Sequence, residues 1–75
     1  MNAKRLKTIN DIIEKLAEIV NALETLRDEE QDSYDNMPEN FQETERGERS
    51  TEAVEALDEA LNSLEEALGS LERIE

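Results

Sequence analysis

Two stretches of this chain place apolar residues at alternating steps of three and four, and this pattern restricts the fold more than any other feature. Such steps put the side chains on one face of an α-helix, at the a and d positions of a heptad, where they pack along a seam. The positions are Leu6, Ile9, Ile13, Leu16, Val20 and Leu23, then Val54, Leu57, Leu61, Leu64, Leu68 and Leu71. The sequence therefore predicts an all-α protein with two long helices.

A third apolar column, at heptad position g, flanks each seam. Its members are Ile12, Ile19 and Leu26 in the first stretch and Ala53, Ala60 and Ala67, followed by Ile74, in the second. Because large and small side chains interdigitate closely, we expect the two columns to pack on one another. The apolar stripe is also wider than a two-stranded seam requires.

The segment between the two stretches predicts that the first helix ends there and that a separate short helix follows. A residue that precedes proline is disfavoured in the helical region, so the first helix should end before Pro38. Pro38 suits the first position of a short helix and Gly47 suits its end, while Ser50 suits the N-cap of the second long helix. The predicted elements are a helix over residues 3–34, a connection with a short helix over 35–49 and a helix over 50–75.

A connection shorter than either helix predicts an antiparallel helical hairpin. A lone hairpin leaves part of its wide stripe in water, so we expect a homodimer in which two hairpins form a four-helix bundle. The expected dimer seam is Ile12, Ile19, Leu26, Leu57, Leu64 and Leu71. The alternative is a monomer in which the segment after Pro38 folds back over the seam as a third helix. Met37 and Phe41 are expected to be buried against the turn end of the seam.

The formal net charge is −13, from 21 acidic and 8 basic residues, and it is concentrated in the middle of the chain. Between Asp28 and Glu66 the bases are Arg46 and Arg49 alone, among 15 acids. Such a field attracts basic surfaces and repels nucleic acid and anionic membranes. We therefore expect a basic protein partner, with no direct nucleic-acid or membrane binding. No apolar stretch approaches the ~18 residues of a membrane span, so we expect a cytoplasmic protein.

The residue types present exclude several kinds of chemistry. The chain has no Cys and no His, which excludes a Cys and His zinc site and a nucleophile activated by His. Carboxylates spaced along an outer helix face are normally solvated and keep ordinary acidity. We therefore expect a protein that is not an enzyme and that uses no cofactor and no metal.

One segment matches the ligand spacing of an EF-hand calcium loop. The matching residues are Asp28, Glu30, Asp32, Tyr34, Asn36 and Glu39. However, Ser33 stands where the sharp turn needs Gly, and Asp35 stands where an apolar residue usually seats the loop. The heptad pattern also continues through this segment as helix. We expect loose association of cations rather than a specific calcium site.

The connection reads Tyr34-Asp35-Asn36-Met37-Pro38-Glu39-Asn40-Phe41-Gln42, followed by Glu45-Arg46-Gly47-Glu48 and a heptad helix of Leu, Ala and Glu. In the sequence of this connection the chain resembles a group of small, acidic, uncharacterised proteins encoded by phages and prophages of Gram-positive bacteria. The resemblance spans most of the chain and is specific in the connection. It implies a phage context, in which short acidic proteins often inhibit host enzymes or defence systems, but it brings no established activity or site.

Two functions of different classes follow from these patterns. The first is an inhibitor or regulator that binds a basic, nucleic-acid-binding host protein, as a DNA mimic or anti-CRISPR protein does. Its expected partner-binding residues are Asp28, Glu29, Asp32, Asp35, Glu39, Glu43, Glu45 and Glu48. The second is a structural self-association module whose charge serves solubility.

Overall fold

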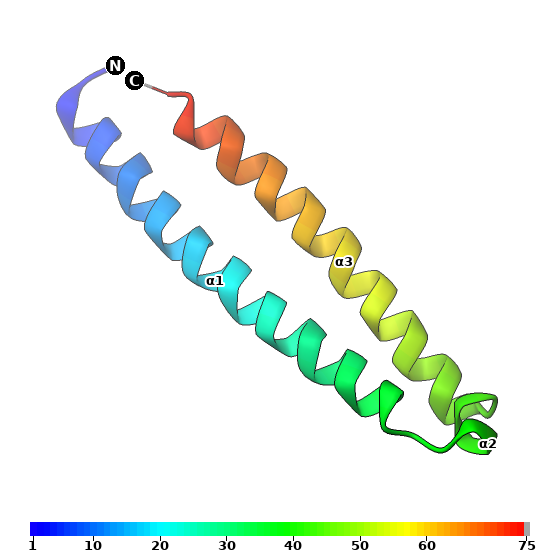
Figure 1. Cartoon of the computed structure of the whole chain (residues 1–75). Helices are drawn as coiled ribbons and strands as arrows, with labels where there is room; N and C mark the ends of the chain where they lie inside the picture. Colours follow the sequence, from blue (N-terminus) through cyan, green and yellow to red (C-terminus); the bar gives the residue numbers. More distant parts are fainter. Residues whose placement is uncertain (75) are drawn as a thin grey trace.

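The computed structural model of the protein describes residues 1–74, which form three helices and no strand. They are α1 (Ala3–Asp35), α2 (Glu39–Gln42) and α3 (Glu45–Glu72). The two long helices lie side by side and antiparallel, α2 sits at the turn, and the start of α1 and the end of α3 lie at the opposite end of the rod (Figure 1). The molecule is a rod of 59 × 14 × 13 Å. The predictions of an all-α fold and of a helical hairpin are confirmed.

Both ends of α1 are closed by local hydrogen bonds. At the start, the side chain of Asn2 accepts a hydrogen bond of 2.8 Å from the backbone N–H of Arg5, which satisfies one free donor of the first turn. At the end, the N–H of Asn36 donates to the carbonyl of Asp32 at 3.0 Å. Pro38 then prevents further helix, and the predicted break is confirmed.

The seam between α1 and α3 buries few side chains. Val20 and Leu61 are the buried apolar residues in the described part of the chain, at 6% and 2% exposure. The other seam residues are half-buried, among them Leu57, Leu64 and Leu71 of the expected dimer seam. The two helices thus meet along one narrow line of contact.

The start of α3 differs from the prediction. The helix begins at Glu45 with Thr44 as its N-cap residue, five residues before Ser50. Gly47 does not end the short helix but lies buried in the first turn of α3. A Cβ atom on Gly47 would stand 2.0 Å from the carbonyl oxygen of Gln42, so the chain turns back too closely here for any side chain. The predicted capping role of Ser50 and the predicted end at Gly47 are wrong.

The two g columns do not interdigitate within the chain. Ile12, Ile19 and Leu26 remain 47%, 50% and 50% exposed, and Ala60 and Ala67 are exposed as well. In two helices that pack through a and d, the g positions flank the contact rather than fill it. The expectation that large and small columns cover each other in one hairpin is therefore wrong.

The short helix also differs from its expected role. α2 has four residues, packs against α3 at the turn and does not extend along the rod as a third helix (Figure 1). Met37 is half-buried, but Phe41 is 49% exposed, which corrects the prediction that its ring is buried against the seam. An exposed ring at the turn is available to a partner.

Replacing each of the two glycines by alanine should change the stability of the protein in opposite directions. Gly47→Ala should lower the melting temperature, because overpacking against the backbone of Gln42 costs about 1–3 kcal/mol. Gly69→Ala is the matched control, since nothing lies within 4 Å of its Cβ position. It should raise the stability by about 0.5–1 kcal/mol through helix propensity. Circular dichroism at one protein concentration measures both, and equal shifts of the same sign would contradict the close approach at Gly47.

Candidate partner-binding site

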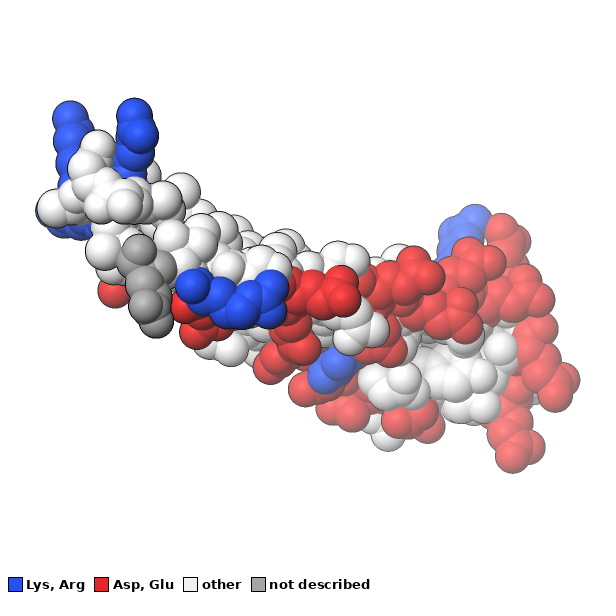
Figure 2. All heavy atoms as spheres, turned by 90° about the horizontal axis from the view of Figure 1, so that it is seen from above, with Lys and Arg blue, Asp and Glu red and all other residues white. Residues whose placement is uncertain are grey.

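The eight predicted partner-binding carboxylates gather at the turn end of the rod, and all of them are exposed. Asp28, Glu29, Asp32 and Asp35 lie on the last turns of α1, Glu39 and Glu43 lie at the two ends of α2, and Glu45 and Glu48 lie in the first turn of α3. Figure 2 shows the acidic side chains massed over this half of the molecule, with lysines and arginines prominent at the other end. The structure thus brings the predicted residues together from three helices. We call this region the acidic turn.

Two arginines neutralise a small part of the acidic turn. Arg27 pairs with Asp28 at 3.1 Å, and Arg49 pairs with Glu45 at 2.6 Å one helical turn away. The other six predicted carboxylates form no ion pair among residues 1–74. Both of these pairs involve exposed carboxylates, so they add little stability and leave the field of the cluster strongly negative.

The acids at the end of α1 lie where a helix disfavours them. The last turn of a helix carries partial negative charge, and an acid there costs roughly 0.3–1 kcal/mol. The last turn of α1 contains no base, and Asp32 and Asp35 lie within it one turn apart. Like charges at this spacing also repel each other. By contrast, Glu45 and Glu48 in the first turn of α3 are stabilised by the helix dipole. Folding alone therefore does not explain the acids on α1.

Near the turn the seam becomes polar. The next seam positions after Val20 and Leu23 are Arg27 and Glu30, and those before Val54 include Ser50. The hydroxyl of the buried Ser50 donates to the half-buried carboxylate of Glu30 at 2.6 Å, which joins α3 to α1. A buried polar pair of this kind is costly to separate and fixes the register of the two helices.

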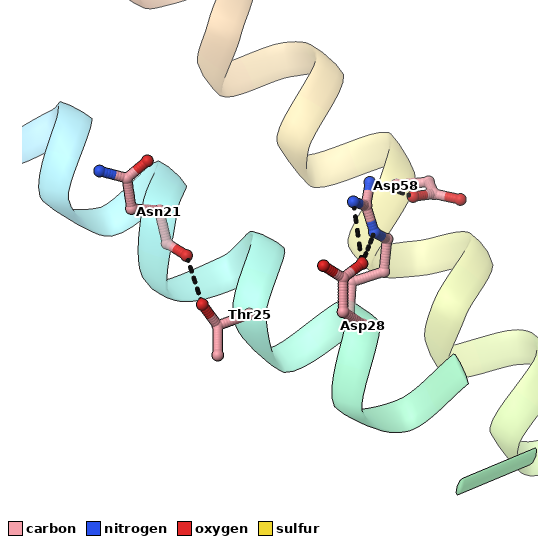
Figure 3. Close-up of polar contacts among 5 residues, drawn as sticks. Asn21, Thr25, Asp28 and Asp58 are labelled. Carbon is pink, nitrogen blue, oxygen red and sulfur yellow. Dashed lines mark hydrogen bonds and ion pairs between the residues drawn. The ribbon is translucent and has the colours of Figure 1, made fainter. Parts of the chain in front are cut away.

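A second polar link lies one turn further from the acidic turn. Arg27 donates to Asp58 of α3 at 3.1 Å and also to Asp28 of its own helix, so one guanidinium joins two carboxylates (Figure 3). The hydrogen bonds to Asp58 and then to Asp28 raise the pKa of Arg27. The same view shows the hydroxyl of Thr25 donating to the carbonyl of Asn21, a bond within α1.

A groove runs beside Tyr34 at the turn end. Two adjoining hollows of about 470 Å³ and 320 Å³ share Tyr34, Thr51 and Glu55 as lining residues. The larger hollow is also lined by Gln42, Glu43, Glu48 and Glu52. The side-chain amide of Gln42 donates to the carbonyl of Tyr34 at 2.9 Å and so fixes α2 beside this groove. An aromatic ring with carboxylates around it is a suitable site for a lysine or arginine side chain of a partner.

Sequence reasoning missed part of this groove. Glu52 and Glu55 line it, although neither belongs to the eight predicted carboxylates. Their position depends on α3 beginning at Glu45, which brings its first turns beside the end of α1. The only sequence signal was the acidic character of α3 itself, which does not distinguish these two residues from its other acids.

The segment that matches a calcium loop is helical. α1 continues without interruption through Asp35, so Asp28, Asp32 and the residues between them cannot wrap around an ion as an EF-hand loop does. Within residues 1–74 no three acidic side chains are close enough to form a metal site. None of the three helices is long and apolar enough to cross a membrane, as judged over the same residues.

Comparisons with protein-family models, with curated proteins and with solved structures found no match to this chain. A function for this protein is therefore inferred from the geometry of the acidic turn and of the groove.

Removing the hydrogen bond between Glu30 and Ser50 should lower the stability of the protein. Ser50→Ala should lower the free energy of unfolding by about 1 kcal/mol or more, because it leaves a half-buried carboxylate without its donor. Ser63→Ala on the exposed side of α3 is the matched control and should be neutral or slightly stabilising. Thermal unfolding at a single protein concentration tests both variants. Equal effects would show that the bond contributes nothing to folding.

Proposed function

We propose that this protein is a non-catalytic inhibitor or regulator that binds a basic, nucleic-acid-binding protein through its acidic turn. The observation that carries the proposal is the exposure of eight carboxylates from three helices on one end of a rigid rod. Successive acids on one helix face stand ~5–6 Å apart, which is the scale of the spacing between backbone phosphates. A nucleic-acid-binding surface would meet a similar row of negative charges here.

The groove beside Tyr34 supports the same proposal by offering a place for one basic side chain. Ring and carboxylates together favour a planar guanidinium, which stacks on aromatic faces and binds carboxylates through two N–H groups. The exposed Phe41 adds apolar contact area at the turn. The acidic turn would give fast, salt-sensitive association, and the groove would give selectivity for arginine.

The proposed context is the cytoplasm of a bacterial host. There the chain acts as a phage-type anti-defence protein, such as an anti-CRISPR protein or another DNA mimic. The resemblance of its connection to acidic phage and prophage proteins supports this context. In this proposal two hairpins pair as a four-helix bundle through Ile12, Ile19 and Leu26 of the expected dimer seam, because one hairpin leaves these three side chains about half exposed.

The second candidate function is a structural self-association module with no basic target. The exposed apolar column of α1 and the small buried core favour it. In that case the acids keep the assembly soluble, and their exact positions do not matter. The two candidates therefore differ in whether the location of charge affects binding.

Two variants that lose the same number of charges, one in the acidic turn and one away from it, test the proposal. Changing Asp28, Glu29, Asp32 and Asp35 together to Asn or Gln should weaken partner binding at physiological ionic strength by at least about tenfold, the effect of losing about 1.4 kcal/mol. The same variant should fold at least as well as wild type, because it relieves repulsion on α1. The partner is first captured from bacterial lysate at low salt, eluted by salt, identified and purified, and its affinity is then measured by titration.

The matched control removes the same number of charges from positions away from the acidic turn. Asp11, Glu14, Glu18 and Glu72 are changed together to Asn or Gln, which leaves the acidic turn intact. At physiological ionic strength this variant should bind within about twofold of wild type, because exposed charges beyond a Debye length of ~8 Å are largely screened. Equal losses in the two variants, or no loss in either, would refute binding through the acidic turn.

A further inference from the structure

One side of the hairpin presents an apolar surface that stays about half exposed in the part of the chain that the structure describes. Ile12, Ile19 and Leu26 stand on it, about 10.5 Å apart along α1 and close to half exposed. The g positions of two antiparallel packed helices lie on the same side of their seam, so the small g residues of α3 lie beside them. We define the apolar face as Ile12, Ile19, Leu26, Ala53, Ala60 and Ala67. Figure 2 shows uncharged residues along part of one edge of the rod, between the basic end and the acidic turn.

The total accessible surface is larger than a compact monomer of this mass would have. The chain of 8.6 kDa exposes 5837 Å². A globular monomer of the same mass exposes about 4,700 Å², so the excess is about 1,100 Å². A stable protein interface buries about 800 Å² on each partner. The excess is therefore enough for one such interface.

The order of charge along the apolar face is self-complementary. Along α1, Arg5 precedes the stripe in its column, and Glu29 follows Leu26 on the adjacent column. When two copies of α1 are placed antiparallel and centred on Ile19, Ile12 lies opposite the partner subunit's Leu26. Arg5 then lies opposite the partner subunit's Ser33, about 6 Å along the helix axis from the partner subunit's Glu29. Apolar groups thus meet apolar groups, and opposite charges meet at both ends.

The opposite orientation is electrostatically unfavourable. With both turns at one end, the large column of each α1 would rest on the small column of the partner subunit's α3. That packing would also place the two acidic turns together, each with eight exposed carboxylates against the three arginines Arg27, Arg46 and Arg49. Like charges brought within a Debye length repel, so this arrangement is disfavoured.

We propose that the apolar face binds a second copy of this chain with the two hairpins in opposite directions. The two acidic turns then lie at opposite ends of the dimer, separated by nearly the 59 Å length of the rod. Resting on the proposed function, this arrangement makes the protein a two-ended ligand that can engage two copies of its basic partner. Each end would supply one acidic turn and one Tyr34 groove.

A distance measurement between the two turns tests the orientation. The chain contains no Cys, so Asn40→Cys provides a single exposed site for a nitroxide label at the turn. Double electron–electron resonance on the labelled protein should give a distance close to the 59 Å length of the rod. A distance below half that length would place the turns together and overturn the proposal. The absence of any dipolar signal at concentrations where wild type is tested would overturn the dimer itself.

A pair of variants tests the face. Ile19→Lys places two like charges near the two-fold axis and should convert the protein to monomer by sedimentation equilibrium. Asn21→Lys adds the same charge on a different side of α1 and should leave the dimer intact. If both variants stay dimeric, or both become monomeric, the assignment of the face is wrong. The labelled Asn40→Cys protein keeps an unaltered face, so it decides the question even if Ile19→Lys unfolds.

The outcomes separate this inference from the proposed function. If the labels show both turns at one end while the variant without the four acids on α1 still loses its partner, the orientation is wrong and the proposed function stands. If the labels show opposite ends while that variant binds normally, the dimer stands and the acidic turn is not the binding site.

Discussion

The shortage of buried apolar surface between α1 and α3 is the constraint on which the rest of the structure depends. Within the described residues, two helices that meet along one line bury only Val20 and Leu61 among the apolar side chains of the seam. The radius of gyration is 17.2 Å, against about 11 Å for a compact domain of this length. Hydrophobic burial is the main favourable contribution to folding, and small single cores rarely supply more than ~3–5 kcal/mol of net stability. A hairpin of this shape gains most from covering its apolar face.

The polar end of the seam serves a different purpose from the apolar remainder. Leucine and isoleucine contacts permit sliding by a heptad, whereas Glu30 with Ser50, and Arg27 with Asp58, each match in one register only. Partly buried polar pairs of this kind are weak sources of stability and can define a unique pairing. They lie at the base of the acidic turn, so the alignment of its carboxylates across α1 and α3 follows from them. The turn is therefore a fixed arrangement of charge.

The long helices and the break between them could be predicted from the sequence because they depend on local signals. Heptad spacing and Pro38 act over a few residues, and the structure agrees with both. The start of α3 could not be predicted, because the buried Gly47 is required by the nearby backbone of Gln42 and Ser50 is bonded to a residue twenty positions earlier. The preference of Gly47 for a helix end was overridden by the close turn of the backbone at Gln42, and the preference of Ser50 for a cap by its contact with α1.

The site was predicted in part for the same reason. The gathering of the eight carboxylates at one end could be predicted from their positions along the sequence, since any hairpin brings both sides of its turn together. The groove beside Tyr34 depends on how α2 folds onto α3, and so Glu52 and Glu55 were not found. The exposure of Phe41 likewise follows from the shortness of α2, which no sequence pattern fixed.

The most direct test of the central claim is the dependence of thermal unfolding on protein concentration. If folding of the hairpin requires coverage of its apolar face by a second copy, the melting temperature must rise as the concentration rises, by mass action. Circular dichroism melts over about a hundredfold range of concentration should show a steady increase, together with dimers by sedimentation equilibrium. A single cooperative transition at the same temperature throughout, with monomers only, would contradict the claim that one hairpin is incomplete.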